Sequence, residues 1–490
     1  MFRTAQIRAI ENRAFVADPP PALMEMAGAA AAREARAMLG DRSRVLVLAG
    51  AGNNGGDALV AARHLRQSWL DVQVVLLGDP ATLPPDAANA FEAWRSGGGD
   101  VLSALPETLA ADLVIDGLFG IGLGRPIEGA VADAIARLNQ ARLPVLALDI
   151  PSGLDADTGR ILGIAVRATA TITFIGLKPG LLTLDGPDHA GRIVVEDLGL
   201  AAMAGDVPSG LAIDAGVVRR ALPPRVANSH KGSYGTVGIV GGAAGMVGAA
   251  LLAARTALHA GAGKVLVGHQ DEDAPRVDPI QPELMLRTVR EAVSAASVLV
   301  VGPGLGQSEA ARRVLQSCLD VDVPLVLDAD ALNLIGTDAL LASQVAHRAA
   351  PTVITPHPAE AARLLHETTA TVQADRVGVA LRLAQRLKAC TVLKGAGSVC
   401  AAPDGAWSIN TSGNPGMASG GTGDVLAGLV AALLAQGAAP FDALQAAVHV
   451  HGLAGDRLLD ALGGPLGITA SGLVATIPQV LNAIIGSSAR

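Results

Sequence analysis

The sequence predicts an α/β protein of two domains, each built on a parallel β-sheet with helices on both faces. Its 490 residues exceed what one ordinary hydrophobic core accommodates. Short runs of Val, Ile and Leu alternate with Ala-rich helical stretches almost throughout, which is the pattern of parallel sheets covered by helices. The 58 glycines accompany no charged or low-complexity runs, so they indicate many tight loops.

Six strands are expected in each half. In the first half they are Val45–Leu48, Val72–Leu77, Leu113–Ile115, Val145–Leu148, Thr171–Phe174 and Ile193–Val195. In the second half they are Thr236–Val240, Val265–Val267, Val298–Val301, Leu325–Leu327, Val353–Thr355 and Thr391–Leu393. Between the halves, Ala201–Pro224 is richer in Gly, Pro and Asp and lacks a strong apolar period, which indicates a linker centred near residue 212. The expected domains are residues 1–212 and 213–490.

Charge and composition argue against several classes of protein. A net charge of −8 disfavours a general nucleic-acid binder. Cys318, Cys390 and Cys400 form neither a CxxC motif nor an even set, so we expect reduced core residues in a cytoplasmic protein. The uncharged segment Gly232–Ala254 has the length of a membrane span, but its seven glycines and the strand-like start Thr236–Val240 favour a buried strand, a glycine turn and a helix. The N-terminus lacks the apolar core of a signal peptide, and no membrane partner is expected.

Three loops of the first half follow strand ends. The strand Val45–Leu48 leads into Ala49–Asp57, which reads AGAGNNGGD, and then into a helix expected over Ala58–Trp69. Two further strands lead into Asp116–Pro126 and Asp149–Gly153. Because ligands of open α/β sheets collect at the carboxyl ends of strands, these loops are expected to face one crevice. The glycine spacing is not the dinucleotide fingerprint GxGxxG, which argues against a generic dehydrogenase.

Polar side chains in these loops suit two kinds of chemistry. Asn54, Asp116 and Ser152 supply only oxygen ligands, which favours a hard cation. Lys178 follows a later strand, and with Asp149 in the same pocket it would form an acid–base pair. For any single loop, a purely structural interpretation is favoured, in which each Asp caps a turn and each glycine serves backbone geometry. The occurrence of all three loops in order, together with Lys178, favours a functional interpretation.

Together with Leu23–Gly28, the strings AGAGNNGGD, DGLFGIGLGRP and DIPSGLDADTG resemble the NAD(P)H-hydrate epimerase domain over about residues 1–210. The resemblance implies a Rossmann-like three-layer α/β/α sandwich, an isomerase activity, and potassium bound by Asn54, Asp116 and Ser152. It also implies that the hydrated nicotinamide nucleotide is held by Asn53, Asn54, Gly55, Gly56, Asp57, Gly120, Ile121, Gly122, Leu123, Gly124, Arg125, Pro126 and Asp149. Met26 stands where the family usually has a polar residue, which weakens any substrate contact assigned to that helix.

The second half contains the most informative motif of the chain. Asn410–Asp424 reads NTSGNPGMASGGTGD and runs directly into the apolar stretch Val425–Gln436. Its glycines let consecutive backbone N–H groups face one concavity, and a helix starting near Gly423 adds about half an electron of positive charge. The motif therefore predicts a phosphate site in which Asp424 takes a proton from a substrate hydroxyl. The alternative, an ordinary N-terminal helix cap, would be favoured for an isolated GTGD.

Loops after neighbouring strands of this half are expected to face the same site. Lys394 precedes the small glycine loop Gly395–Ser398, where a point charge suits a nucleotide phosphate. Considered alone, His357 is more often a capping residue than a catalyst, and Glu360 more often a solvated helix residue. Beside the phosphate site, Glu360 is expected to hold magnesium indirectly.

From about Asn228 to Gly472 the chain resembles the ADP-dependent NAD(P)H-hydrate dehydratase, a member of the ribokinase-like fold. The strings that carry this resemblance are NSHKGSYGTVGIVGGAAGMVGAALLAA, GPGLG, DADALN, TPHPAE, KGAGS, NTSGNPGMASGGTGDVLAG and HGLAGD. The resemblance implies Mg²⁺ in the site and ADP contacts from Lys394, Gly395, Ala396, Gly397, Ser398 and Gly423. It places the hydrated nicotinamide near Ala249, Gly304, His357 and Asp424. Ser398 occupies a position where Thr is common, and the hydroxyl is kept.

Both domains would then serve one repair task on NADH or NADPH that has taken up water across the nicotinamide ring. The resemblance implies that the first domain interconverts the R and S hydrates, and that the second, a lyase, dehydrates the S form while converting ADP to AMP and phosphate. Because hydroxide leaves poorly, phosphorylation of the hydroxyl creates a leaving group, with Asp424 as the base. The expected partners are the hydrates NADHX and NADPHX and ADP, in a homo-oligomer.

Two alternatives remain at this point. One is a ribokinase-like kinase for a small molecule such as a vitamin precursor alcohol, with a regulatory first half. The other is a nucleotide-sensing scaffold without turnover. A stable phosphorylated product would favour the kinase, ligand-dependent stabilisation without turnover would favour the scaffold, and regained absorbance of reduced nicotinamide would favour repair.

Overall fold

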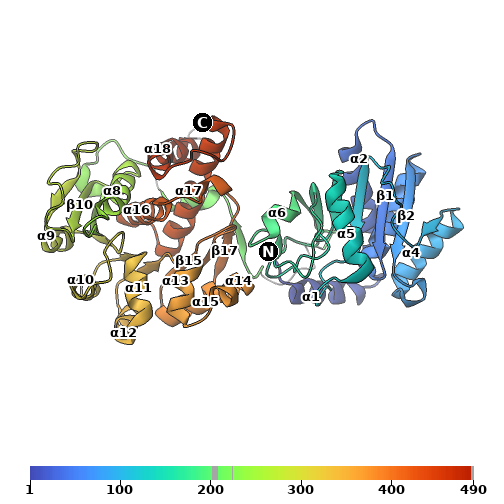
Figure 1. The fold of residues 1–490 in the computed structure, drawn as a ribbon, viewed down its shortest axis with the longest axis horizontal. Coiled ribbons are helices and arrows are strands. Elements are labelled where there is room, and N and C mark those ends of the chain that lie inside the picture. The colour runs from blue at the N-terminus through green and yellow to red at the C-terminus, as the bar shows by residue number, and fades with distance from the viewer. Residues whose placement is uncertain (201–207, 223, 487–490) are drawn as a thin grey trace. The chain divides into compact units, whose positions relative to one another are not determined.

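The structure is a computed structural model that describes residues 1–200, 208–222 and 224–486. The chain divides into two compact units, Met1–Ser209 and Gly210–Arg490 (Figure 1). Each unit has its own sheet and its own buried cores. The α/β class with two domains is therefore confirmed.

The first unit alternates strands and helices along the chain. Its elements are α1 (Thr4–Phe15), α2 (Leu23–Leu39), β1 (Arg44–Gly50), α3 (Asn53–Gln67), β2 (Asp71–Leu77), α4 (Pro85–Ser96), β3 (Val101–Leu102), β4 (Leu113–Gly117), α5 (Gly129–Ala141), β5 (Val145–Leu148), β6 (Ala170–Phe174), α6 (Gly186–Ala190) and β7 (Arg192–Glu196), with 3₁₀ helices at Pro80–Thr82 and Pro179–Leu181.

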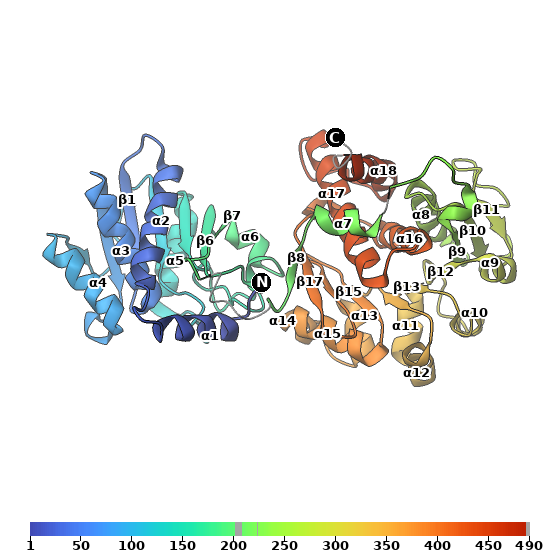
Figure 2. The ribbon, with the colours of Figure 1, turned by 180° about the vertical axis from the view of Figure 1, so that it is seen from behind.

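The seven strands of this unit form a parallel sheet in the order β3-β2-β1-β4-β5-β6-β7. Alternate residues of β1 face opposite sides: Val45 and Val47 pack with helices α1 to α4, whereas Leu46 and Leu48 pack with α5. The result is the expected three-layer sandwich, with α1 to α4 on one face (Figure 2). The direction in which strands are added reverses between β1 and β4, which is where open α/β sheets bind ligands.

One helix of the first unit differs from the expectation in a way that matters for the site. The helix expected over Ala58–Trp69 begins earlier, at Asn53. Gly55 and Gly56 therefore lie inside its first turns, where a Cβ on Gly55 would collide with the carbonyl oxygen of Gly50. These glycines serve close packing of α3 against β1, and they bring polar side chains of the helix start directly to the strand end.

The second unit has a larger sheet and more helices. Its elements are β8 (Leu211–Ile213), α7 (Ala215–Ala221), β9 (Thr236–Gly241), α8 (Val247–His259), β10 (Lys264–His269), β11 (Met285–Arg287), α9 (Val289–Ala295), β12 (Val298–Val301), α10 (Glu309–Leu319), β13 (Leu325–Leu327), α11 (Asp330–Thr337), α12 (Ala339–His347), β14 (Thr352–Ile354), α13 (Pro358–Leu365), α14 (Thr369–Ala374), α15 (Arg376–Leu387), β15 (Cys390–Leu393), β16 (Val399–Ala401), β17 (Trp407–Asn410), α16 (Thr422–Ala435), α17 (Pro440–Leu462) and α18 (Ala470–Gly486), with 3₁₀ helices at Lys231–Tyr234 and Pro415–Met417.

The sheet of the second unit has the order β11-β10-β9-β12-β13-β14-β15-β16-β17-β8. It is parallel from β11 to β15, and β16 then runs antiparallel to both of its neighbours. One face is buried by α7, α8, α16, α17 and α18 in a single core (Figure 1). The apolar α16 lies in that core, with Val425 to Leu434 buried along its length.

Two expectations for this unit were incomplete. The linker expected over Ala201–Pro224 is too long, because β8 pairs with β17 and α7 packs on α17; residues 201–207 of that stretch lie outside the described residues. The antiparallel β16 and β17 were not predicted, although the Ala402–Gly405 turn between them, APDG, carries Pro, Asp and Gly in the order typical of a tight turn.

The segment Gly232–Ala254 forms a strand and a helix, as predicted, not a membrane span. Among the described residues, no helix has both the length and the apolarity to cross a bilayer. Cys318, Cys390 and Cys400 are buried and carry free thiols, as expected.

Two candidate active sites

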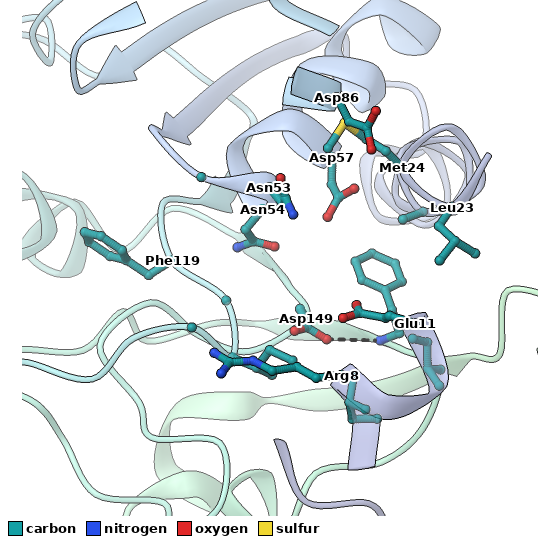
Figure 3. A pocket seen from close by; sticks show the side chains of 18 of the residues that line it. Arg8, Glu11, Leu23, Met24, Asn53, Asn54, Asp57, Asp86, Phe119 and Asp149 are labelled. Atoms are coloured by element: carbon teal, nitrogen blue, oxygen red, sulfur yellow. Dashed lines mark hydrogen bonds between the residues drawn. The ribbon is translucent and has the colours of Figure 1, made fainter. Parts of the chain in front are cut away.

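A cavity of about 510 Å³ opens in the first unit where β1, β4 and β5 end (Figure 3). Helices α1 and α2 contribute further walls. Of the residues implied by the resemblance, those lining the cavity are Asn53, Asn54, Asp57, Gly120, Ile121, Gly122, Leu123 and Asp149. Gly55 and Gly56 lie behind this wall within α3, and Gly124, Arg125 and Pro126 are not part of the lining.

Asp149 and Lys178 form an ion pair at one wall of the cavity. Asp149 follows β5 in the left-handed region, with φ 65°, and its carboxylate also accepts the Phe174 N–H at 3.3 Å. Lys178 is 0% exposed and donates in addition to Thr173 Oγ1 at 2.9 Å and to the Phe174 carbonyl at 2.7 Å. The three donors of this ammonium are thus directed at three protein acceptors. This geometry holds the Asp149 carboxylate in place at the cavity.

Asp116 and Ser152 meet in a buried cluster beside the cavity. Asp116 accepts the Ser152 hydroxyl at 2.6 Å and the Ser152 N–H at 2.8 Å. Burial raises the pKa of Asp116 to about 6, and the Ser152 hydrogen bonds act against that rise. Asn54 donates from Nδ2 to the Leu148 carbonyl at 3.2 Å, whereas its buried Oδ1 has no hydrogen-bond partner in the described part of the chain. A buried oxygen of this kind can act as a ligand to a cation or accept a hydrogen bond from a water.

Two more carboxyl groups face the same cavity. Asp57, on α3, was among the expected residues, whereas Glu11, on α1, was not. Burial raises the pKa of Glu11, and the nearby Asp149 charge raises it further. Burial also raises the pKa of Asp57 well above its usual range, with Asp149 and Glu11 adding to the effect. The only signal for Glu11 in the sequence is an acid inside the apolar stripe Ile7, Ile10 and Ala14 of α1.

The phosphate motif of the second unit folds as expected at the start of α16. Gly421 precedes the helix with φ 88°, and Asp424 lies in its first turn. Burial raises the pKa of Asp424 to about 7, with the Asp328 charge raising it and the Lys394 charge lowering it. A carboxyl group with this pKa at a helix N-terminus is suited to proton transfer near neutral pH.

Lys394 lies near the carboxylates of Asp328 and Glu360 at this helix start, and the charge of Asp424 also acts on it. Its Nζ is 2.9 Å from Asp328 Oδ1 and 4.0 Å from Glu360 Oε2. A Cβ added to Gly423 would lie 3.2 Å from Lys394 Nζ, so the ammonium sits directly beside the first turn of α16. Burial favours the neutral amine, but the charges of Asp328 and Glu360 outweigh it and raise the pKa of Lys394. Asp328, 1% exposed, is the main partner. The DADALN string that begins with it was noted in the sequence, but its pairing with Lys394 was not expected.

His357 and Glu360 form a capping box at the start of α13. The Glu360 carboxylate accepts the His357 N–H at 2.8 Å, and His357 Nδ1 accepts the Ala359 N–H at 3.1 Å. Burial raises the pKa of Glu360 to about 7, although Lys394 lowers it. His357 is thus a capping residue in this structure, and its Nε2 lies 3.2 Å from Glu360 Oε1.

Hydrogen bonds from Ser398 and Arg376 stabilise the loop from Lys394 to Ser398. Ser398 Oγ accepts the Gly395 N–H at 3.2 Å and donates to the Gly395 carbonyl at 3.0 Å. Arg376, 1% exposed, donates to the carbonyls of Leu393 and Lys394 at 3.2 and 3.3 Å. This arginine was not expected from the sequence, because nothing in the helical pattern of α15 marks a buried cation.

The remaining expected residues come together on the α8 side of the sheet. A Cβ added to Gly304, which has φ 59°, would lie 3.2 Å from the Ala249 Cβ. Helix α8, which carries Ala249, packs against α16, which carries Asp424. Among the described residues, no group of three or more His, Cys, Asp or Glu side chains is arranged to hold a metal ion.

Comparison with known proteins matches both units. The family model described as NAD(P)H-hydrate dehydratase matches residues 237–479, and the one described as YjeF-related protein N-terminus matches residues 21–180. A bifunctional NAD(P)H-hydrate repair enzyme of Escherichia coli is 40% identical over 469 residues, which cover 94% of this chain and 89% of that one. The chain belongs to the family of bifunctional NAD(P)H-hydrate repair enzymes. A family member from Coxiella burnetii is 38% identical and covers 98% of this chain and 99% of its own.

Solved structures extend the family assignment to the fold of the second unit. An ADP/ATP-dependent NAD(P)H-hydrate dehydratase from Bacillus subtilis, co-crystallised with ATP/Mg²⁺, is 32% identical with a TM-score of 0.50 and covers 56% of this chain and 99% of that one. A ribokinase-like superfamily protein from Enterococcus faecalis is 26% identical with a TM-score of 0.51 and covers 57% of this chain and 98% of its own. The expected ribokinase-like fold of the repair enzyme's second unit is confirmed.

Proposed function

We propose that this repair enzyme acts on hydrated NADH and NADPH with both of its units. The first unit interconverts the R and S hydrates, and the second dehydrates the S hydrate while converting ADP to AMP and phosphate. The observation that carries this proposal is the joint presence of two family regions, each with a lysine–carboxylate cluster at the carboxyl ends of its strands. We assign the epimerase to residues 1–212 and the dehydratase to residues 213–490, close to the division of the chain into its two units.

In the second unit, Asp424 is the base for the substrate hydroxyl. Its place in the first turn of α16 puts it beside free backbone N–H groups, which with Lys394 hold the phosphates of ADP. We place ADP on Lys394, Gly423 and the loop through Gly395, Ala396, Gly397 and Ser398, and the hydrated nicotinamide near Ala249, Gly304, His357 and Asp424. Deprotonation of the hydroxyl by Asp424 makes the oxygen a nucleophile for the terminal phosphoryl group. The phosphate then leaves with the C–O bonding electrons, the neighbouring ring carbon loses a proton to water, and the C–H electrons form the ring double bond.

The donor set of this site fits Mg²⁺ only together with the nucleotide. The protein supplies carboxylate oxygens from Asp328, Glu360 and Asp424, but no complete cage. Mg²⁺ in such sites is held by one or two carboxylates and by substrate phosphates, and it neutralises charge on the transferred group. The role of Glu360 as an indirect Mg²⁺ holder, through water, agrees with its 5% exposed side chain behind Lys394.

In the first unit, we propose that Asp149 contacts the reacting ring and that Lys178 acts through Asp149. The substrate would lie against Asn53 to Asp57 and Gly120 to Pro126, as the resemblance implies. The chemistry of Asn54, Asp116 and Ser152 fits potassium, because the set offers oxygen donors with a single carboxylate and Asn54 Oδ1 lacks a partner. Potassium would fix the positions of the chain segments at the carboxyl ends of β1, β4 and β5 relative to one another, because each of them supplies one ligand.

Two further expectations concern the whole chain. The three free, buried thiols support a cytoplasmic location. The expected homo-oligomer stays a prediction.

The test uses the extent of repair as well as its rate. Purified full-length protein is incubated with mixed R and S hydrates and either ADP or ATP, while the absorbance of reduced nicotinamide is followed. With both activities the whole hydrate pool is converted, because the epimerase feeds the R form to the dehydratase. Asp149→Asn should stop the reaction at the S fraction. A stable phosphorylated product without regained absorbance would contradict the proposal and favour a small-molecule kinase.

A further inference from the structure

Four carboxyl groups line the cavity of the first unit, and the charges of three of them, Glu11, Asp57 and Asp149, act on one another. Among the described residues, only Asp149 of these three has a lysine partner. Figure 3 shows Asp57 on one side of the cavity, with its carboxylate directed toward Asp149 and Glu11 on the other side. Asp149 is paired with the buried Lys178. Neither Glu11 nor Asp57 has an ion pair among the described residues. The Lys178 ammonium therefore holds the Asp149 carboxylate in place, whereas Glu11 and Asp57 are available to exchange protons.

We propose that Glu11 and Asp57 are the two proton-transfer residues of the epimerase, acting from opposite sides of the hydrated ring. This inference rests on the proposed function of the first unit and assigns its chemistry. Glu11 lies on α1, outside every motif of the family region matched over residues 21–180, so its part in the site comes from the folded structure alone.

The chemistry of the hydrate calls for two such groups. Hydration of an enamine places the hydroxyl on the carbon next to the ring nitrogen. A carboxylic acid on the hydroxyl side donates its proton to that oxygen, the C–O bond breaks, the nitrogen lone pair forms C=N⁺, and one water leaves. A second water then adds to the opposite face, and the carboxylate on that side takes its proton. One carboxyl has lost a proton and the other has gained one, so the reverse epimerisation runs through the same two groups.

The surroundings of these two groups favour one acid and one carboxylate. Burial and the Asp149 charge raise the pKa of Glu11, while Lys178 and Arg8 act against that rise. Burial is also the main cause that raises the pKa of Asp57, and Asp149 and Glu11 contribute. Asp86, which also lines the cavity, is exposed. Because two nearby carboxylates resist simultaneous ionisation, a single proton on the pair is the favoured state. The remaining negative charge then stabilises the C=N⁺ intermediate.

The test follows interconversion of separated R and S hydrates by the full-length protein without ADP, above the rate in buffer. Glu11→Gln and Asp57→Asn should each slow interconversion by about 10²–10⁴-fold while the dehydratase rate on pure S hydrate is kept. Glu92→Gln, the same change at an exposed residue of α4, is the matched control and should leave both rates unchanged. Glu11→Asp should recover part of the loss, since it restores the acid on a shorter side chain.

Two readouts separate this role from a structural one. In H₂¹⁸O, each inversion should place one solvent oxygen in the product, because the C–O bond breaks. The wild-type rate should fall as pH rises through the raised pKa values, and Glu11→Gln should change that pH profile, because only Asp57 of the pair then titrates. Full activity of Glu11→Gln with an unchanged pH profile, or inversion without ¹⁸O incorporation, would overturn the inference while leaving the epimerase function standing. Absence of any interconversion by the wild-type protein would instead remove the proposed function itself.

Discussion

Lys178 in the first unit and Lys394 in the second both pair with an aspartate at the carboxyl ends of parallel strands, but their surroundings differ. Lys178 is 0% exposed, and its three donors are directed at Asp149, Thr173 and a backbone carbonyl. The Lys394 side chain is 20% exposed, lies beside the first turn of α16, and has carboxylates on more than one side. The first lysine therefore orients a carboxylate, whereas the second can also meet an incoming phosphate.

The mechanisms proposed for the two sites also use opposite protonation states of their acids. In the second unit Asp424 must be ionised to accept a proton, and its pKa is raised to about 7. In the first unit one of Glu11 and Asp57 must be protonated to release the hydroxyl, and burial favours that form. Desolvation thus raises the pKa of carboxyl groups in both sites, and the proposed mechanisms use one such group as a base in the second unit and one as an acid in the first.

The largest effect is expected when the proposed base of the second unit, Asp424, is removed. Asp424→Asn should lower dehydratase turnover by about 10²–10⁴-fold, because the amide cannot accept the hydroxyl proton. Epimerisation should continue at the wild-type rate, and ADP should still bind, as measured by calorimetry. Turnover is followed through the absorbance of reduced nicotinamide.

Asp442→Asn serves as the matched control for this variant. Asp442 also lies in the first turn of a helix, α17, so the substitution removes the same type of helix-end charge without touching the site. It should leave turnover unchanged. Equal activity of the two variants would mean that Asp424 is a helix-end residue only.

Replacing Lys178 and Lys394 separately by methionine should distinguish a lysine that orients a carboxylate from one that binds phosphate. Lys178→Met leaves the Asp149 charge without its partner in a site where that side chain is 13% exposed, so unfolding should become easier by about 3 kcal/mol and epimerisation should be lost. Lys394→Met should raise the KM for ADP by about 10–100-fold, the value of a charge-assisted hydrogen bond, with epimerisation kept. Thermal unfolding and the two activities are measured on both variants.

Lys388→Met, at an exposed lysine just before β15, controls for the loss of one positive charge in the second unit. It should change neither the KM for ADP nor the unfolding temperature. If Lys394→Met instead unfolds the protein and leaves the KM for ADP unchanged, the two lysines play the same structural part and the contrast between them fails.

The pH profiles of the two activities should run in opposite directions. Below about pH 7, kcat/KM for dehydration should fall about tenfold per pH unit, since only ionised Asp424 acts as the base. The epimerase rate should instead fall as pH rises, because the pair of Glu11 and Asp57 then loses the single proton that one of them must donate. Profiles that rise together would show that a carboxylate base limits both steps.

Local sequence patterns predicted most of the fold, and they predicted some of the residues of each candidate site. Val/Ile runs marked twelve strands correctly in position, because buried parallel strands are apolar throughout, and glycine strings marked the loops after them. Asp424 could be placed because the helix start and its acid are adjacent in the sequence. Asp149 and Lys178 were also expected in one pocket, and the structure shows their ion pair. The pairing of Lys394 with Asp328 could not be found this way. Lys394 meets Asp328 only because the loops after β13 and β15 meet in the folded sheet.

Glu11 and β8 are two features that local sequence patterns did not predict, because each depends on contacts with distant parts of the chain. Glu11 enters the cavity through the packing of α1, which no motif describes. Leu211–Ile213 lies in a stretch rich in Gly, Pro and Asp that was expected to be a linker, and it becomes a strand by pairing with β17. In both cases the partner is distant in the sequence, so neither periodicity nor spacing contains the information.

The smallest expected effect concerns potassium, which should stabilise the first unit and not the second. If K⁺ is present at about tenfold its Kd, it should stabilise that unit by about 1.4 kcal/mol, which corresponds to a few degrees in the midpoint of its unfolding transition. Asn54→Leu should abolish this increment, because it removes the buried Oδ1 that has no protein partner. The measurement compares thermal unfolding in KCl and in choline chloride at equal ionic strength.

Asn139→Leu is the matched control, because Asn139 also donates its Nδ2 to a backbone carbonyl, that of Ala165 at 3.0 Å, yet lies outside the cavity. Asn139 Oδ1 also accepts the Arg167 N–H at 3.0 Å, so Asn139→Leu loses one more hydrogen bond than Asn54→Leu. The comparison therefore uses the K⁺-dependent increment of each variant, measured against the stability of the same variant in choline chloride. An increment that survives Asn54→Leu would place the cation elsewhere. Asp116 and Ser152, which already satisfy each other, would then be a structural pair that fixes the loops after β4 and β5 without an ion.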